Sequence, residues 1–117
     1  MSLDARDARV VLVTTPDADT ARRIARTLVE ERHAACGNIV PQITSVFRWQ
    51  GTVQEEAETL LVLKTSAARL DALAARVTEL HPYDVPEVLA LPVAEGNQPY
   101  LDWLGACLAP GGEADES

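Results

Sequence analysis

Two short segments of the sequence gather side chains that could bind a ligand or take part in a reaction. The first is ACGNIVP, residues 35–41, which contains the thiol of Cys36 and the amide of Asn38. A free cysteine serves either as a small apolar side chain or as a soft metal ligand or thiolate. Asn38 can bond its own backbone as readily as a ligand. Both residues are therefore candidates for ligand binding.

The second segment is HPYDVPEV, residues 81–88, where an imidazole, a phenol and a carboxylate lie close together at His81, Tyr83 and Glu87. A histidine at the end of a helix is stabilised by the helix dipole even when it has no chemical role. Two prolines, at positions 82 and 86, stiffen the segment. Oxygen and nitrogen ligands on a rigid loop suit the recognition of a metal ion or a small anion.

Four further side chains stand out at the ends of apolar segments. Phe47, Arg48 and Trp49 directly precede the turn at Gly51, and exposed aromatic and arginine side chains are typical anchors of protein interfaces. Lys64 ends a run of aliphatic residues, where a lysine more often extends its amine to water than acts in catalysis. The chain has no glycine-rich phosphate loop, HExxH, CxxC pair or serine elbow.

The overall composition narrows the choice of partners and location. The 117 residues carry a formal net charge of −8, which disfavours binding to nucleic acid or to an anionic membrane surface. No apolar run is long enough for a membrane span or a signal peptide, so we expect a cytoplasmic protein. Cys36 and Cys107 lie far apart in the sequence, which predicts reduced thiols and neither a disulfide framework nor a zinc ribbon.

The elements that must position these residues follow from apolar spacing. Residues 9–15 predict a buried strand, and Asp17 can cap a helix with an apolar stripe from Ala21 to Val29. Residues 36–50 predict a second strand that turns at Gly51 into a third, whose polar first half should project as an arm.

The second half of the chain repeats this order. Ser66 is the expected N-cap of a second helix that ends at His81, and residues 87–93 predict a short strand. Pro92 in that strand indicates a sheet edge or a bulge. Residues 98–108 predict a last helix with proline in its first turn. We expect one domain over residues 9–108, with flexible termini at 1–8 and 110–117.

The order strand, helix, strand, strand, helix, strand predicts an α+β, ferredoxin-like split βαβ fold with an extra C-terminal helix. Both main helices should cover one face of a four-stranded antiparallel sheet. The other face needs a partner for its apolar positions, which should include some of Val40, Ile43, Phe47, Leu61 and Leu63. A homo-oligomer follows, and this pattern does not distinguish a dimer from a trimer.

Across residues 10–108 the chain resembles the CutA family of divalent-cation tolerance proteins. The resemblance is carried by TTPDADTARRIARTLVEERHAACGNIVPQITSVFRWQG, by EEAETLLVLKT and by ELHPYDVPEVLALPVAEGNQPYLDWL. One departure is Gly37, where the family more often has a small apolar residue such as valine or alanine. The resemblance implies a homotrimer built like the PII signalling proteins, with hairpin arms that embrace neighbouring subunits. It also implies a role in tolerance of divalent cations, particularly copper, without an established enzymatic reaction.

By matching position, the resemblance implies a cleft between subunits that is lined by Cys36, Asn38, Trp49, Lys64, His81, Tyr83 and Glu87. The leading hypothesis is a copper site with Cys36 and His81 as ligands and Glu87 completing it. The alternative is a sensor of a small anion or metabolite, held by Lys64 and backbone amides. A third hypothesis, with Cys36 as nucleophile and His81 as base, is disfavoured because Cys36 follows the end of a helix, where the dipole opposes an anion.

Overall fold

The computed structural model describes residues 2–110, and all but the first residue of the predicted C-terminal tail at 110–117 lies outside this range. Strand β1 (Ala8–Thr15) leads into helix α1 (Ala18–Glu30). The expected cap is confirmed, because the Asp17 carboxylate accepts a hydrogen bond of 2.7 Å from the backbone N–H of Thr20. The buried positions of α1 lie three and four residues apart, so one stripe of the helix faces the sheet.

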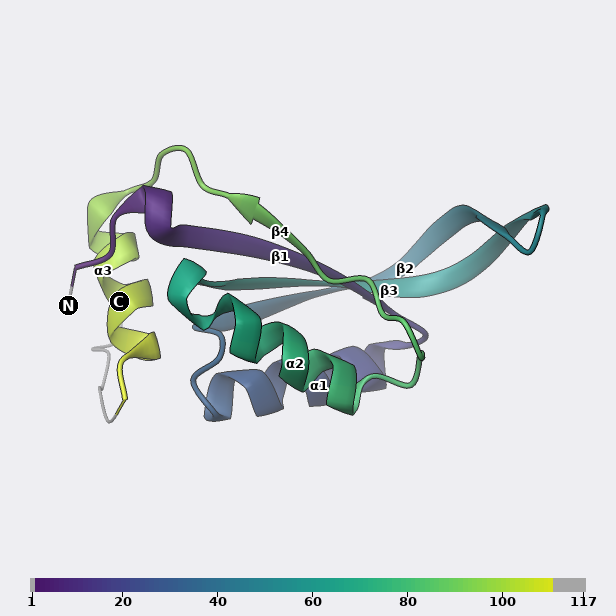
Figure 1. The fold of residues 1–117 in the computed structure, drawn as a ribbon, viewed down its shortest axis with the longest axis horizontal. Coiled ribbons are helices and arrows are strands. Elements are labelled where there is room, and N and C mark those ends of the chain that lie inside the picture. Colours follow the sequence, from purple (N-terminus) through teal and green to yellow (C-terminus); the bar gives the residue numbers. More distant parts are fainter. Residues whose placement is uncertain (1, 111–117) are drawn as a thin grey trace.

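Strands β2 (Cys36–Trp49) and β3 (Thr52–Ser66) form a long hairpin that projects beyond the helices (Figure 1). Gly51 takes a φ of 82° in the turn, a conformation that glycine adopts without strain. A bulge between Val40 and Ile43 interrupts the ladder where the arm leaves the body of the domain. The apolar half of β3 therefore stays in the sheet while its polar half extends outward.

The second helix begins differently from the expectation. Ser66 makes no side-chain cap bond, and a 3-10 helix (Ala67–Arg69) precedes α2 (Leu70–Leu80). Strand β4 (Leu89–Pro92) is shorter than the predicted strand at residues 87–93, and α3 (Gln98–Leu108) starts with Pro99 in its first turn. The predicted ferredoxin-like fold is confirmed, with the antiparallel strand order β2-β3-β1-β4 and β4 at an edge, as Pro92 indicates.

Helices α1 and α2 lie together on one face of the sheet (Figure 1). The core between these layers consists of aliphatic side chains, and Val11, Val13, Leu61 and Leu63 are fully shielded from solvent in it. Leu61 and Leu63 were candidates for the opposite face, and this expectation is wrong. Their register opposite Val13 and Val11 turns them toward the helices.

The opposite side of the sheet, here called the uncovered face, is lined by the apolar residues that alternate with the core. No helix of residues 2–110 lies over its centre, since α3 packs at the end of the sheet away from the arm (Figure 1). Leu89 and Leu91 on β4 retain 58% and 47% of their exposed area. The strand registers place on this face Val10, Leu12, Val40, Leu60, Val62, Leu89 and Leu91.

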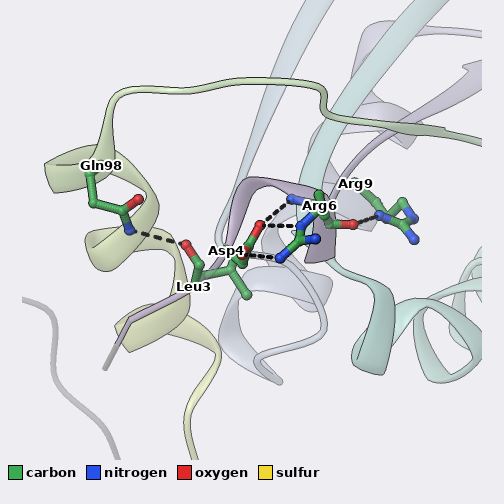
Figure 2. A network of polar contacts seen from close by, with 5 residues as sticks. All are labelled: Leu3, Asp4, Arg6, Arg9 and Gln98. Carbon is green, nitrogen blue, oxygen red and sulfur yellow. Dashed lines mark hydrogen bonds and ion pairs between the residues drawn. The ribbon is translucent and has the colours of Figure 1, made fainter.

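Leu3, in the N-terminal segment 1–8 that the sequence predicts to be flexible, contacts α3. A 3-10 helix (Ala5–Asp7) is capped by Asp4, and the hydrogen bonds from the Arg6 side chain lower the pKa of Asp4 to about 2. The Gln98 side chain donates a hydrogen bond of 3.2 Å to the Leu3 carbonyl (Figure 2). Leu3 also packs beside Leu104 of α3, and this apolar contact offsets the cost of ordering the segment.

Among the described residues, no helix is long and apolar enough to cross a membrane.

Candidate functional site

Cys36 is the first residue of β2 and lies on the uncovered face near α3. It pairs across the ladder with Lys64, and directly paired residues of neighbouring strands point to the same side of the sheet. The Cys36 thiol is half-buried, and its sulfur lies 3.6 Å from the hydroxyl oxygen of Tyr100 on α3. This weak contact leaves the sulfur available to a stronger ligand.

The close packing of β2 against α1 at this point depends on Gly37. A Cβ atom added at Gly37 would lie 3.1 Å from the Ala25 Cβ and 3.1 Å from a Leu63 methyl carbon. These distances are shorter than ordinary van der Waals contact. The departure from the family pattern therefore allows a closer approach of the strand that carries Cys36.

Lys64 and Asn38 form a polar pair beside Cys36. The Lys64 amine donates a hydrogen bond of 2.6 Å to the Asn38 side-chain carbonyl oxygen. Neither residue has a carboxylate as ion-pair partner among residues 2–110, so the lysine keeps its positive charge uncompensated at short range. Together they offer an ammonium group and an amide to a ligand on the uncovered face.

His81 ends α2 and is buried, with 7% of its surface exposed. Its Nδ1 accepts a hydrogen bond of 3.1 Å from the backbone N–H of Tyr83. The ring is therefore the tautomer protonated at Nε2, which donates to the Thr14 carbonyl at 2.7 Å. Both nitrogens are already engaged, so His81 can ligate a metal ion only after one of these bonds breaks.

Tyr83 extends the same network to the base of the arm. Its hydroxyl donates a hydrogen bond of 2.8 Å to the carboxylate of Glu58, a buried acid on β3. Its ring packs at a tilt against the ring of His81, with the ring centroids 4.6 Å apart. Burial, with a further contribution from this bond to Glu58, raises the pKa of Tyr83 to about 12. The network ties the 81–88 loop to β1 and β3.

The structure does not bring Cys36 and His81 together within one subunit. Cys36 pairs with Lys64 across the sheet, and Lys64 pairs in turn with Val10 of β1. His81 instead bonds to Thr14, which is four residues, or about 13 Å, further along β1. Glu87 is exposed on its loop. Among residues 2–110, no three His, Cys, Asp or Glu side chains are arranged to hold a metal ion.

The three predicted interface residues lie near the end of the arm, far from both clusters. The Trp49 side chain keeps 58% of its surface exposed, and Arg48 donates only a long hydrogen bond of 3.4 Å to the Gly51 carbonyl. Phe47 is half-buried. Within one subunit, Trp49 therefore cannot line a cleft with Cys36 or with His81.

Two residues of these clusters, Glu58 and Tyr100, have no signal in the sequence. Glu58 is one of several acids on the arm, and Tyr100 looks like an ordinary helix residue. Burial, the contact with Cys36 and the charges that Cys36 and Cys107 would carry raise the pKa of Tyr100 to about 12. The contact of Tyr100 with Cys36 becomes visible only once α3 is placed at the start of β2.

The strand order and the two helices on one face define a ferredoxin-like α+β protein with an uncovered sheet face and a projecting arm. The sequence profile described as CutA1 divalent ion tolerance protein matches residues 9–107. The chain thus belongs to the CutA1 family, as the resemblance predicts.

Named relatives agree with this assignment. The divalent-cation tolerance protein CutA of Thermus thermophilus is 59% identical over 95 residues, which are 81% of this chain and 92% of the relative. The human protein CutA is 49% identical over 92 residues, or 79% of this chain, and the match spans about half (51%) of its length.

Solved structures show the same fold. The Cut A1 structure from Thermus thermophilus has a TM-score of 0.81 at 58% identity, covering 83% of this chain and 94% of its own. The CutA1 structure from Oryza sativa has a TM-score of 0.86 at 46% identity, covering 91% of this chain and 98% of its own.

Proposed function

We propose that this protein is a non-enzymatic divalent-cation tolerance protein that acts as a homotrimer and binds copper between its subunits. Family membership supports the tolerance role, since the family and the Thermus thermophilus relative are both named for it. Copper is the preferred ion because it suits a thiol ligand by softness. The trimer and the metal are proposals that the following contacts support.

The uncovered face and the arm support assembly. The apolar side chains of the uncovered face form one continuous surface across four strands, and monomeric proteins rarely leave such a patch in water. The exposed Trp49 and the polar arm extend beyond the body, where an isolated hairpin is only marginally stable. A closed ring of three copies would cover both features.

The observation that carries the metal proposal is the position of Cys36. Its half-buried thiol lies on the uncovered face with one weak contact, at the surface where a neighbouring subunit would pack. A soft ion would gain a sulfur ligand there without breaking a strong hydrogen bond. Residues 2–110 of one subunit hold no three-ligand cluster, so a site with three or more protein ligands needs at least one from another subunit.

His81 and Glu87 stay in the proposal as ligands from a neighbouring subunit. His81 would have to release either Tyr83 or Thr14 to bind the ion, so its contribution should be smaller than that of Cys36. The separation of Cys36 and His81 also argues against a cysteine nucleophile with a histidine base in one subunit. A non-enzymatic role agrees with this geometry.

Calorimetric titration with Cu(I), without oxygen, tests the proposal, with Cys36→Ser and His81→Ala as variants and His33→Ala as matched control. We expect Cys36→Ser to weaken binding most, and acid to release the ion because protons compete with it for its ligands. Coupling between Cys36→Ser and His81→Ala would show that they share one ion. Unchanged affinity in both variants and in their combination would overturn the metal proposal.

A small-anion sensor is the second candidate, because Lys64 presents an uncompensated ammonium group beside Cys36. A carboxylate or phosphate could displace the neutral Asn38 oxygen and gain a charge-assisted hydrogen bond. Thermal shifts with carboxylates and nucleotides, compared with metal salts, separate the two functions. Stabilisation by anions that is lost in Lys64→Met, together with no response to metals, would favour the sensor.

A further inference from the structure

The second cysteine of the chain lies near the first, although 71 positions separate them in the sequence. Cys107 is in the last turn of α3, and its half-buried side chain packs against the small apolar cluster of Ala35, Leu104 and Leu108. Ala35 directly precedes Cys36. The apolar cluster therefore holds α3 against the start of β2 and places both thiols at the same end of the sheet.

Tyr100 lies on the same side of α3 as Cys107, because seven residues, or about two turns, separate them. Its hydroxyl lies 3.6 Å from the Cys36 sulfur, so this side of α3 faces the start of β2. Cys107 packs against the cluster that contains Ala35, the chain neighbour of Cys36. Both thiols therefore lie where α3 meets the start of β2. Burial, followed by the charge that Cys36 would carry, raises the pKa of the Cys107 thiol, which agrees with this placement.

Neither sulfur is held by a strong bond. Cys36 has the weak contact with Tyr100, and the Cys107 sulfur makes no hydrogen bond with any of residues 2–110. Both thiols are free, with no disulfide between them. A modest rotation about the Cα–Cβ bond of either side chain can therefore redirect its sulfur.

Two cations flank the pair. Lys64 lies directly opposite Cys36 in the ladder, and the Arg32 guanidinium donates a hydrogen bond of 2.9 Å to the Cys107 carbonyl. The Arg32 charge acts to lower the pKa of the Cys107 thiol, against the effect of burial. A second arginine, Arg69, donates to the Leu108 carbonyl, so the C-terminus of α3 is capped by positive charge. The positive charges of Lys64, Arg32 and Arg69 favour the binding of a negatively charged metal–thiolate complex at this place.

We propose that Cys36 and Cys107 form a two-thiolate site for a soft ion of low coordination number, with Cu(I) as the fitting chemistry. The inference rests on the proposed copper function and supplies a second ligand from the same subunit. Thiolates select Cu(I) among the copper states, and two sulfurs satisfy an ion that accepts linear coordination. On binding, each thiol releases one proton to water, and no oxidant or reductant is required.

The charge balance fits the surroundings. Two thiolates and one Cu(I) carry a net charge of −1, which Arg32 and Lys64 can offset. With metal–sulfur bonds of about 2.3 Å, as for zinc, the sulfurs must approach to about 4.6 Å. The loose hold on both side chains permits this approach. A harder ion with more ligands would find no third protein donor among the described residues.

The test is a competition for Cu(I) between the assembled protein and a chromophoric Cu(I) chelator, without oxygen, at pH 7. The variants are Cys36→Ser, Cys107→Ser and the double substitution, with Tyr100→Phe as control for the shape of the site. We expect wild type to bind one ion per subunit. Each single serine variant should lose at least about 100-fold in affinity, and the double variant should lose little more, because ligands of one ion are coupled. Tyr100→Phe should bind as wild type does.

Alkylation supplies a second measurement, since bound Cu(I) should protect both Cys36 and Cys107 from iodoacetamide, as read by mass spectrometry. Wild-type affinity in Cys107→Ser with loss in Cys36→Ser would overturn the two-thiolate site and leave the proposed copper function standing. Wild-type affinity in both single variants would overturn both. Protection of Cys36 alone in wild type would also contradict the two-thiolate site.

Discussion

Replacing His81 by alanine should destabilise the protein because the imidazole joins three segments. It donates to the Thr14 carbonyl at 2.7 Å, accepts from the Tyr83 N–H at 3.1 Å and packs at a tilt against the Tyr83 ring. A buried polar group left without a partner costs about 1–3 kcal/mol, and an aromatic pair contributes about 0.5–1.5 kcal/mol. Thr14 lies beyond the end of β4, where water can replace part of the lost bonding, so we expect a loss of about 3 kcal/mol.

Urea unfolding of the metal-free protein at fixed subunit concentration measures this loss. The matched control is His33→Ala, at the only other histidine of the chain. His33 makes a long contact of 3.4 Å with Glu31, and its buried Nδ1 has no partner. Its replacement should therefore cost less than about 1 kcal/mol. Equal stability of wild type and His81→Ala would refute this reasoning. It would mean that the two hydrogen bonds of the ring contribute nothing, so that His81 could bind a metal ion without loss of stability.

Three further outcomes follow from the same contacts. Tyr83 and Tyr100, the only tyrosines of the chain, should show no tyrosinate absorbance until the pH nears 12. The stability that their neutral phenols contribute should be complete below pH 10 and lost as the pH rises through 12. Ionisation of both phenols near pH 10 would contradict the environments described here. Gly37→Ala should lower the free energy of unfolding in urea by about 1 kcal/mol, because the added Cβ would lie 3.1 Å from a Leu63 methyl carbon. A more stable variant would show that the neighbouring side chains can move to accommodate the Cβ. Trp49→Ala should weaken assembly by about 2 kcal/mol in sedimentation equilibrium, and an unchanged constant would place its ring outside the interface.

The element order could be predicted from the sequence because each element carries its own local signal. The spacing of apolar residues marks α1, Asp17 marks its start, and Pro92 marks an edge strand. The faces of β3 could not be predicted, since the run from Leu60 to Leu63 is apolar throughout and has no alternation. Only the register with β1 decides which of these residues face the helices.

The candidate site could be predicted only in its separate parts. The types of Cys36 and His81 suggest ligands, but their distance depends on strand register, which local patterns do not encode. For the same reason, the approach of Cys107 to Cys36 is visible only once α3 is placed. The satisfied hydrogen bonds of His81 likewise depend on Thr14, 67 residues away.

The central claim is that the uncovered face and the arm are completed by other copies of the chain. Light scattering of the purified protein at micromolar concentration tests this claim most directly, because it measures mass without a standard. We expect a mass of three times the subunit mass of 12.6 kDa. A folded monomer whose mass stays at one subunit across this concentration range would contradict it.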